Sequence, residues 1–292
     1  MALFDNDFLT KLEYLSIVSR KVFRGQLMAQ RRTKQMGSGI EFADHRQYTA
    51  GDDFRYLDWN LYARHDELLL KRFQEEEDLH VYLLLDCSKS MASGEAGKFD
   101  LARQVTAALA YIALADLDRI SVYAFADGVL NHFPLTRGKA RILSLMQFLE
   151  QLTANGAATN MTQLTQEFVM RAPRQGLALM LSDMYDPDGY RKALDVLRHH
   201  KYEPHVIQIH TTAEAQPKLL GDVELQDVES SDTRKITITE RHLKNYRKVY
   251  QTFLTSIREY CSRYGMGCTI TDTNTTFDQL VLDMMRATGI GK

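Results

Sequence analysis

Several features that mark whole classes of protein are missing from this sequence. No apolar run approaches the ~20 residues that a helix needs to cross a bilayer. The first residues carry Asp5, Asp7 and Glu13 and lack the apolar core of a signal peptide. The 36 basic and 38 acidic residues leave a formal charge of −2, so no global field favours nucleic acid. We therefore expect a cytoplasmic protein with no membrane span and no nucleic-acid partner.

Cysteine is scarce, and its spacing does not suggest a metal site. The three cysteines are Cys87, Cys261 and Cys268, and no two of them form a close pair of the metal-binding type. Their odd number is typical of a reducing compartment. We expect three free thiols, with a disulfide between Cys261 and Cys268 as the alternative.

From about residue 78 onward, the sequence alternates between apolar runs and helical patterns. The runs that we interpret as strands are Val81–Asp86, Ile120–Phe125, Leu177–Leu181 and His205–His210. The helical patterns between them fall at 99–117, 139–152, 163–171 and 188–199. Continuous apolar runs are typical of strands buried on both faces, and their alternation with helices implies right-handed strand–helix–strand units. The sequence therefore predicts an α/β fold with a mostly parallel central sheet flanked by helices.

Two segments do not fit this alternation. Residues 1–77 predict an N-terminal extension, helical over 6–33 and irregular thereafter, whereas residues 78–292 form the α/β domain. Within that domain, residues 218–240 alternate between polar and apolar positions, which is typical of a half-exposed antiparallel hairpin. We therefore expect an extension and a hairpin insertion in addition to the central sheet.

The most informative motif is Asp86-Cys87-Ser88-Lys89-Ser90, which directly follows the apolar run Val81–Leu85. Ligands bind at the carboxyl ends of the strands in open α/β sheets, and this strand offers one carboxylate and two hydroxyls there. Oxygen-only ligands suit a hard divalent cation, above all Mg²⁺. The alternative is structural, because serine and aspartate also cap helices and close turns.

Two later loops are expected at the same edge of the sheet. Thr159 lies in the loop Gly156–Asn160, and Asp183 follows the run Leu177–Leu181. This Asp-x-Ser-x-Ser, Thr, Asp order resembles the metal-ion-dependent adhesion site (MIDAS) of von Willebrand factor type A domains. The order of strands and helices around the motif agrees with that Rossmann-like fold.

The resemblance implies a role for each residue of the set. Ser88, Ser90 and Thr159 would offer hydroxyl oxygens to Mg²⁺, or to Mn²⁺ or Ca²⁺ in its place. Asp86 and Asp183 would hold the ion directly or through water. Because hydroxyls are neutral and only two carboxylates are present, such an ion stays electron-poor, and an open coordination position would attract a carboxylate from a partner.

A second signature lies between residues 37 and 78. It contains Glu41-Phe42, Arg46-Gln47-Tyr48, Gly51-Asp52-Asp53, Asp58-Trp59-Asn60 and Ala63-Arg64. Together with the adhesion-type site, this string resembles the bacterial domain of unknown function 58 family over roughly residues 35–292. Membership implies a type A fold and a usual pairing with MoxR-type AAA+ ATPases, in chaperone-like systems for maturation, cofactor insertion or stress response.

The residues of this second signature also have a structural interpretation. We expect an irregular collar whose ion pairs join Arg46, Arg55 and Arg64 to Asp44, Asp53 and Asp58. Tyr48 and Trp59 would anchor the collar on the α/β core. The alternative is a surface on which a partner docks.

The expected function is a non-enzymatic, divalent-metal-dependent protein-interaction module, because no obvious base or nucleophile accompanies the oxygen-only site. One alternative is a Mg²⁺-dependent phosphoryl-transfer or phosphatase-like enzyme using Asp86. Such sites usually place a second carboxylate where Ser88 stands, and no glycine-rich phosphate loop is visible. Another alternative is nucleic-acid binding through the six basic residues between Arg20 and Lys34. The near-neutral charge and the lack of a reader motif argue against it.

Overall fold

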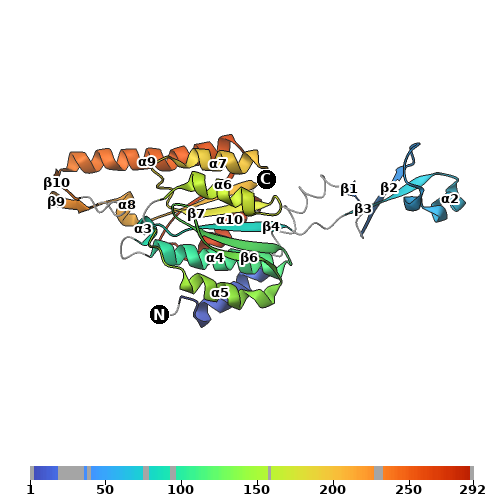
Figure 1. Ribbon diagram of the computed structural model, residues 1–292, viewed down its shortest axis with the longest axis horizontal. Helices are drawn as coiled ribbons and strands as arrows, with labels where there is room; N and C mark the ends of the chain where they lie inside the picture. The colour runs from blue at the N-terminus through green and yellow to red at the C-terminus, as the bar shows by residue number, and fades with distance from the viewer. Residues whose placement is uncertain are drawn as a thin grey trace.

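The centre of the protein is a six-stranded sheet in the order β11-β8-β7-β4-β5-β6, seen here in a computed structural model (Figure 1). The strands are β4 (His80–Asp86), β5 (Arg119–Phe125), β6 (Val129–Arg137), β7 (Leu177–Ser182), β8 (Glu203–His210) and β11 (Gly267–Asp272). Every neighbouring pair is parallel except β5 and β6, which are antiparallel. The prediction of a mostly parallel central sheet is confirmed. The structure describes residues 3–18, 36–37, 41–74, 79–92, 97–156, 159–226 and 233–289.

Helices cover both faces of this sheet. They are α3 (Lys89–Ala92), α4 (Lys98–Ala115), α5 (Ile142–Gln151), α6 (Met161–Arg171), α7 (Tyr190–His199), α8 (Thr212–Ala215), α9 (Glu240–Arg263) and α10 (Phe277–Gly289). One core cluster joins the sheet to α4, α5 and α10, and the other joins it to α6, α7 and α9. Alternate residues of β4 divide between the clusters, Leu83 and Leu85 facing one and Tyr82 and Leu84 the other. This division explains why the run is apolar throughout.

The helical residues 6–18 pack against the sheet domain. The carboxylate of Asp5 caps this helix by accepting a hydrogen bond from the Phe8 amide at 2.9 Å. Leu12 and Leu15 are fully buried in the cluster that contains α4 and α10. The ring of Phe8 lies 4.5 Å from the ring of Phe277. The expected helix over 6–33 is therefore confirmed as far as residue 18; residues 19–35, with the basic stretch Arg20–Lys34, lie outside the described residues.

Residues 36–37 and 41–74 contain a small antiparallel sheet and do not form an irregular collar. Its strands are β1 (Met36–Gly37), β2 (Glu41–Gln47) and β3 (Leu69–Gln74), in the order β1-β3-β2. A 3₁₀ turn, Phe54–Tyr56, and the helix α2 (Trp59–His65) lie between β2 and β3. Figure 1 shows this unit standing away from the six-stranded sheet. The strongly polar sequence of β2 hides its strand character, because pairing with β3 decides its structure.

The ion pairs of this segment differ in part from those expected. Arg55 pairs with Asp53 as predicted, at 2.6 Å, and Arg46 pairs with Asp52 at 2.6 Å. Asp58 pairs with no arginine among the residues that the structure describes. It caps α2 by accepting hydrogen bonds from the Asn60 and Leu61 amides, and its carboxylate also contacts His45 and Lys71.

The expectation that aromatic residues anchor this segment on the α/β core is wrong for both side chains. Trp59 is 60% exposed, and its ring meets the edge of Tyr62 in the same helix. Tyr48 stacks on Phe54, 5.2 Å away, and this contact also lies within the segment. The aromatic residues therefore pack locally.

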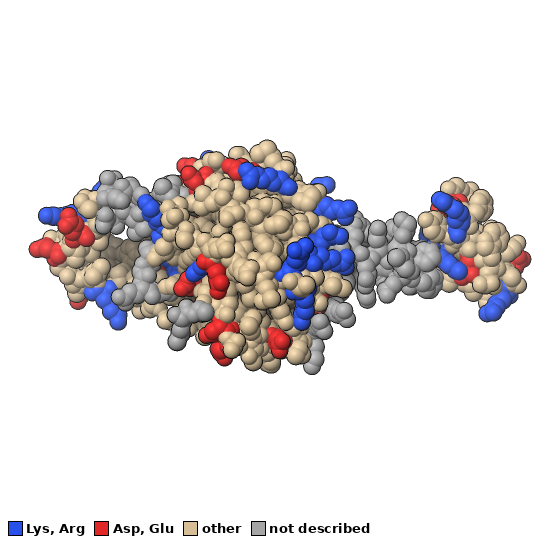
Figure 2. Space-filling model, turned by 60° about the horizontal axis from the view of Figure 1, so that its bottom comes forward, with Lys and Arg blue, Asp and Glu red and all other residues tan. Residues whose placement is uncertain are grey.

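The predicted hairpin is present as β9 (Gly221–Gln226) and β10 (Thr233–Ile238), which pair antiparallel only with each other among the described residues. The helix α9 follows, capped by the Thr239 hydroxyl. All three cysteines are free thiols, as predicted. On the face drawn in Figure 2, basic side chains gather at the end of the main body nearest the small sheet, and acidic side chains are scattered elsewhere.

Candidate functional site

Two buried carboxylates lie at the carboxyl edge of the central sheet. β4 and β7 are parallel neighbours, with Leu85 paired to Leu181, so both strands end at the same edge. Asp86 is the last residue of β4, and Asp183 directly follows β7. Neither side chain has any exposed surface. The sequence prediction that these two residues meet at one edge of the sheet is confirmed.

Both carboxylate oxygens of Asp86 accept hydrogen bonds. The Ser88 amide donates to Oδ1 at 2.9 Å, and the Ser182 hydroxyl donates to Oδ2 at 2.6 Å. Ser182 Oγ in turn accepts a hydrogen bond from the Met184 amide at 2.8 Å. Burial and the negative charge of Asp183 raise the pKa of Asp86 to about 7, although these hydrogen bonds oppose the shift. The two carboxylates are thus close enough to repel one another.

The hydroxyls of Ser88 and Ser90 lie side by side, with their oxygens 2.9 Å apart. Gly156 pairs with this loop: its amide donates to Cys87 O at 3.1 Å, and its carbonyl accepts from the Lys89 amide at 3.1 Å. A Cβ at Gly156 would lie 2.1 Å from the Cβ of Ala126, so only glycine fits this approach. The loop that carries Thr159 is thereby fixed beside the serine motif.

Thr159 is buried in the same region, with 4% of its surface exposed. The next residue, Asn160, donates its amide hydrogen to Ala126 O at 2.8 Å, and its side chain caps α6 by accepting from the Gln163 amide. The first amide of α6, that of Met161, donates to Asp186 at 2.7 Å. Residues 157–158 lie outside the described residues. These bonds tie the Thr159 loop to the loop that follows β7.

A buried lysine completes the site, and sequence reasoning missed it. Lys98, the first residue of α4, has no exposed surface. Its Nζ donates to Asp183 Oδ2 at 2.8 Å and to Glu214 Oε1 at 2.5 Å. The ring of Tyr185 lies 5.5 Å from the ammonium group. The one local feature in the sequence is that this lysine stands at the start of an alanine-rich helix. Its burial could not be predicted from that feature, because its partners are 85 and 116 residues away in the chain.

Glu214 has a second role in the fold. Its Oε2 accepts a hydrogen bond from the Thr211 amide at 2.7 Å, and its own amide donates to Thr211 Oγ1 at 3.0 Å. These two bonds form a capping box that starts α8. One carboxylate therefore joins Lys98 to the segment that leads into β9.

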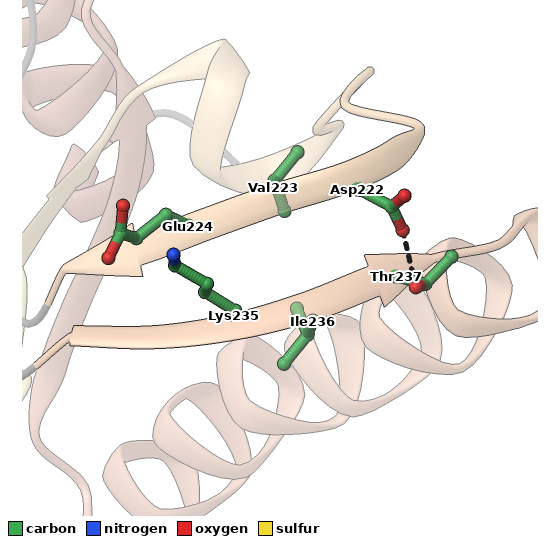
Figure 3. Close-up of a pocket in the computed structure, with 6 residues that line it drawn as sticks. All are labelled: Asp222, Val223, Glu224, Lys235, Ile236 and Thr237. Atoms are coloured by element: carbon green, nitrogen blue, oxygen red, sulfur yellow. Dashed lines mark hydrogen bonds between the residues drawn. The ribbon is translucent and has the colours of Figure 1, made fainter.

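The donor set suits a hard cation. Asp86 and Asp183 supply two carboxylates, and the Ser182 hydroxyl lies beside Asp86. Lys98 pairs with Asp183 and with Glu214, which is outside the donor set. Among the described residues, no group of three or more His, Cys, Asp or Glu side chains could by itself hold a metal ion. A site of two carboxylates and hydroxyls fits Mg²⁺, which prefers oxygen ligands and keeps several waters. A separate shallow hollow of about 440 Å³ lies along the β9–β10 hairpin and contains none of these residues (Figure 3).

Curated relatives from mycobacteria match part of this chain. Uncharacterized protein Rv1480 of Mycobacterium tuberculosis (strain ATCC 25618 / H37Rv) and uncharacterized protein Mb1516 of Mycobacterium bovis are each 25% identical over 206 residues. The match covers 69% of this chain and 65% of each relative, which is less than two thirds of their length.

Two solved structures also resemble the chain at low similarity. The hypothetical protein BatB from Bacteroides thetaiotaomicron is 13% identical with a TM-score of 0.42, covering 71% of this chain and 99% of that chain. An aerotolerance-related membrane protein from Bacteroides fragilis NCTC 9343, with multiple mutations to serines, is 13% identical with a TM-score of 0.45, covering 72% and 99%.

In this chain itself, no helix of the described residues combines the length and apolarity needed to cross a membrane. The family comparison covers more of the chain than the two mycobacterial relatives do. A model of one family matches residues 44–259, which span most of the small sheet, the serine motif, both buried aspartates and much of α9. The chain therefore belongs to the family described as protein of unknown function DUF58.

Proposed function

We propose that this protein is a non-enzymatic, divalent-metal-dependent protein-interaction module with a von Willebrand factor type A-like fold. The observation that carries the proposal is the meeting of two fully buried carboxylates, Asp86 and Asp183, beside the paired hydroxyls of Ser88 and Ser90. Two adjacent carboxylates are costly to bury unless a cation compensates their charge. One lysine compensates only part of the negative charge at this edge.

Each residue of the proposed MIDAS would make a distinct contribution. Ser88, Ser90 and Thr159 would hold Mg²⁺, or Mn²⁺ or Ca²⁺ in its place, through neutral hydroxyl oxygens, and Asp86 and Asp183 through carboxylates or intervening waters. The Ser182 hydroxyl and the Ser88 amide keep the Asp86 carboxylate in one orientation. A bound ion would supply a Lewis-acidic position that accepts a carboxylate from a partner protein.

The surroundings of Asp86 favour binding over phosphoryl transfer. Both of its oxygens already accept hydrogen bonds, and neutral Ser88 stands where phosphatase-like sites usually have a second carboxylate. Asp183, the other carboxylate, is engaged with Lys98. A phosphoester assay separates the two functions: we expect no Mg²⁺-dependent turnover that disappears in an Asp86→Asn variant.

The partner that we propose is a MoxR-type AAA+ ATPase, acting with this protein and an unidentified client in a chaperone-like maturation or stress-response system of the cytoplasm. The support is the family membership of the chain together with a site that would accept a carboxylate. The ATPase would supply the carboxylate that completes the coordination of the ion, so the contact would depend on the metal.

Co-purification tests this function. The full chain would be used as bait for the ATPase, with Mg²⁺ or with EDTA, in unchanged, Asp86→Asn and Ser90→Ala forms. We expect capture by the unchanged chain in Mg²⁺ only, and loss of capture in both variants. Asp283→Ala is the control, because it removes a carboxylate whose side chain is 51% exposed on α10, away from the site. Equal capture with EDTA and in both site variants would refute the proposal.

A further inference from the structure

Lys98 is the most unusual side chain of this site. A lysine with no exposed surface is rare in proteins unless ionic partners surround it. Here one partner, Asp183, has no exposed surface either, and the other, Glu214, is 21% exposed. The Lys98 Nζ donates to both carboxylates, so an ammonium group is held inside the carboxyl edge of the sheet.

Lys98 forms a hydrogen bond with a proposed metal ligand. Its Nζ donates to Asp183 Oδ2 at 2.8 Å, while the other oxygen of that carboxylate, Oδ1, accepts from the Tyr185 amide at 3.1 Å. A divalent ion that is coordinated by Asp183 must share this carboxylate with an ammonium group. Like charges at such separations repel strongly where water is excluded.

Glu214 acts on the lysine from the opposite side. Its Oε1 lies 2.5 Å from the lysine Nζ, and its Oε2 is fixed by the Thr211 amide at the start of α8. The ammonium group is thus held between two carboxylates that come from different loops. The more closely Lys98 pairs with Glu214, the more of Asp183 is left for another cation.

We propose that Lys98 is a resident cation that competes with the divalent metal for Asp183, and that Glu214 relieves this competition by sharing the lysine. This inference rests on the proposed metal site and adds its regulation. Lys98 replaces part of the missing positive charge when the ion is absent, so the metal-free protein stays folded. It also keeps the affinity for the ion low, so occupancy responds to the carboxylate that a partner brings. Lys98 and Glu214 are positioning residues, since neither is a proposed metal ligand.

The competition predicts opposite effects for the two substitutions. Lys98→Met should bind Mn²⁺ and Mg²⁺ at least about tenfold more tightly, because a positive charge beside Asp183 is removed. Glu214→Gln should bind them about threefold to tenfold more weakly, because Lys98 is then left to Asp183 alone. Glutamine keeps an oxygen that can accept from the Thr211 amide, so α8 retains its cap.

A double-mutant cycle separates this mechanism from simple charge effects. If Glu214 acts through the lysine, Glu214→Gln changes the affinity by less than about twofold once Lys98 is methionine. If Glu214 acts only through space, its effect is the same in both backgrounds. Lys139→Met is the control, because Lys139 contacts the Tyr111 ring outside the site and its removal changes the net charge equally.

The experiment is calorimetric titration of the full chain and its variants with Mn²⁺ and Mg²⁺, together with melting temperatures with and without the ion. We expect Lys98→Met to melt lower than the unchanged chain without metal and to gain more on its addition. If Lys98→Met does not fold without metal, Glu214→Gln carries the test alone, and unchanged or tighter binding overturns the proposal.

The outcomes also distinguish this inference from the function on which it rests. If the unchanged chain binds no divalent ion, or if Asp86→Asn binds it equally well, the metal site itself is wrong. If the ion binds and Asp86→Asn abolishes binding, but Lys98→Met binds no more tightly, only the competition is wrong. Independent effects of the two substitutions in the cycle would also overturn it.

Discussion

Ser182 and Asp86, which lie 96 residues apart in the chain, are joined by a hydrogen bond of 2.6 Å between the hydroxyl and the carboxylate. The bond links the ends of β7 and β4 at the edge where the proposed ligands gather. Both side chains are fully buried, so no water can replace either partner. The contact therefore fixes the Asp86 carboxylate before any ion arrives.

Removal of this hydroxyl should weaken the fold. Ser182→Ala leaves one oxygen of a buried carboxylate without its donor, and we expect the free energy of unfolding to fall by about 1–3 kcal/mol. Chemical denaturation at neutral pH measures the change. Ser144→Ala is the control, because Ser144 is exposed on α5 and alanine suits a helix. Equal stability of the two variants would show that the bond contributes nothing.

The glycine beside the serine motif provides a second prediction. Gly156→Ala places a Cβ 2.1 Å from the Ala126 Cβ, so the loop that carries Thr159 and pairs with Ser88 must shift. We expect a loss of about 1–3 kcal/mol in stability and weaker binding of Mn²⁺.

Gly128→Ala is the matched control for this change. Its nearest neighbours would be the flexible ends of Glu167 and Gln163, at 3.0 and 3.3 Å, which can shift with little cost. Denaturation and metal titration of both variants complete the comparison. Unchanged metal affinity in Gly156→Ala would mean that the Thr159 loop is not part of the site.

The pH dependence of stability should report on His205, away from the proposed ligands. Burial lowers the pKa of His205 from 6.5 to about 4. Between pH 6.5 and 4 the unfolded chain therefore binds a proton at His205 that the folded chain does not bind. The contribution of His205 to stability falls as the pH falls through this range, whereas the raised pKa of Asp86 acts in the opposite direction. The loss should be about 1–3 kcal/mol, because the ring keeps some contact with solvent.

Replacement of this histidine isolates its contribution. His205→Gln removes the titrating group and keeps a polar partner for the Thr269 hydroxyl, 2.9 Å from the ring nitrogen. We expect the stability of this variant, relative to that of the unchanged chain, to rise as the pH falls from 6.5 to 4. Denaturation curves across that range provide the measurement, and parallel pH profiles for both proteins would contradict the assignment.

Much of the fold could be predicted because its strands are buried on both faces. The run Val81–Leu85 of β4 is apolar because alternate side chains enter different core clusters. A continuous apolar run of this kind is typical of a strand with helices packed on both faces of its sheet. The same logic placed Asp86 and Asp183 together, because parallel neighbours end at one edge. The hairpin could be predicted because polar and apolar residues alternate along both of its strands.

The parts that sequence reasoning missed depend on tertiary contacts. Polar β2 is a strand because β3 pairs with it, and Trp59 is exposed because α2 presents it outward. The partners of Lys98 come from loops that only the folded sheet brings together. A lysine at the start of a helix has no local feature that distinguishes an internal cation from a solvated one.

Direct metal binding tests the central claim that oxygen ligands from separate loops converge on one divalent ion. The measurement is calorimetric titration of Mn²⁺ into the metal-free full chain, its Asp86→Asn variant and the Asp283→Ala control. We predict one site in the unchanged chain and the control, and affinity reduced by about a hundredfold or more in Asp86→Asn. Absence of binding by the unchanged chain, or equal binding by all three proteins, would contradict the account.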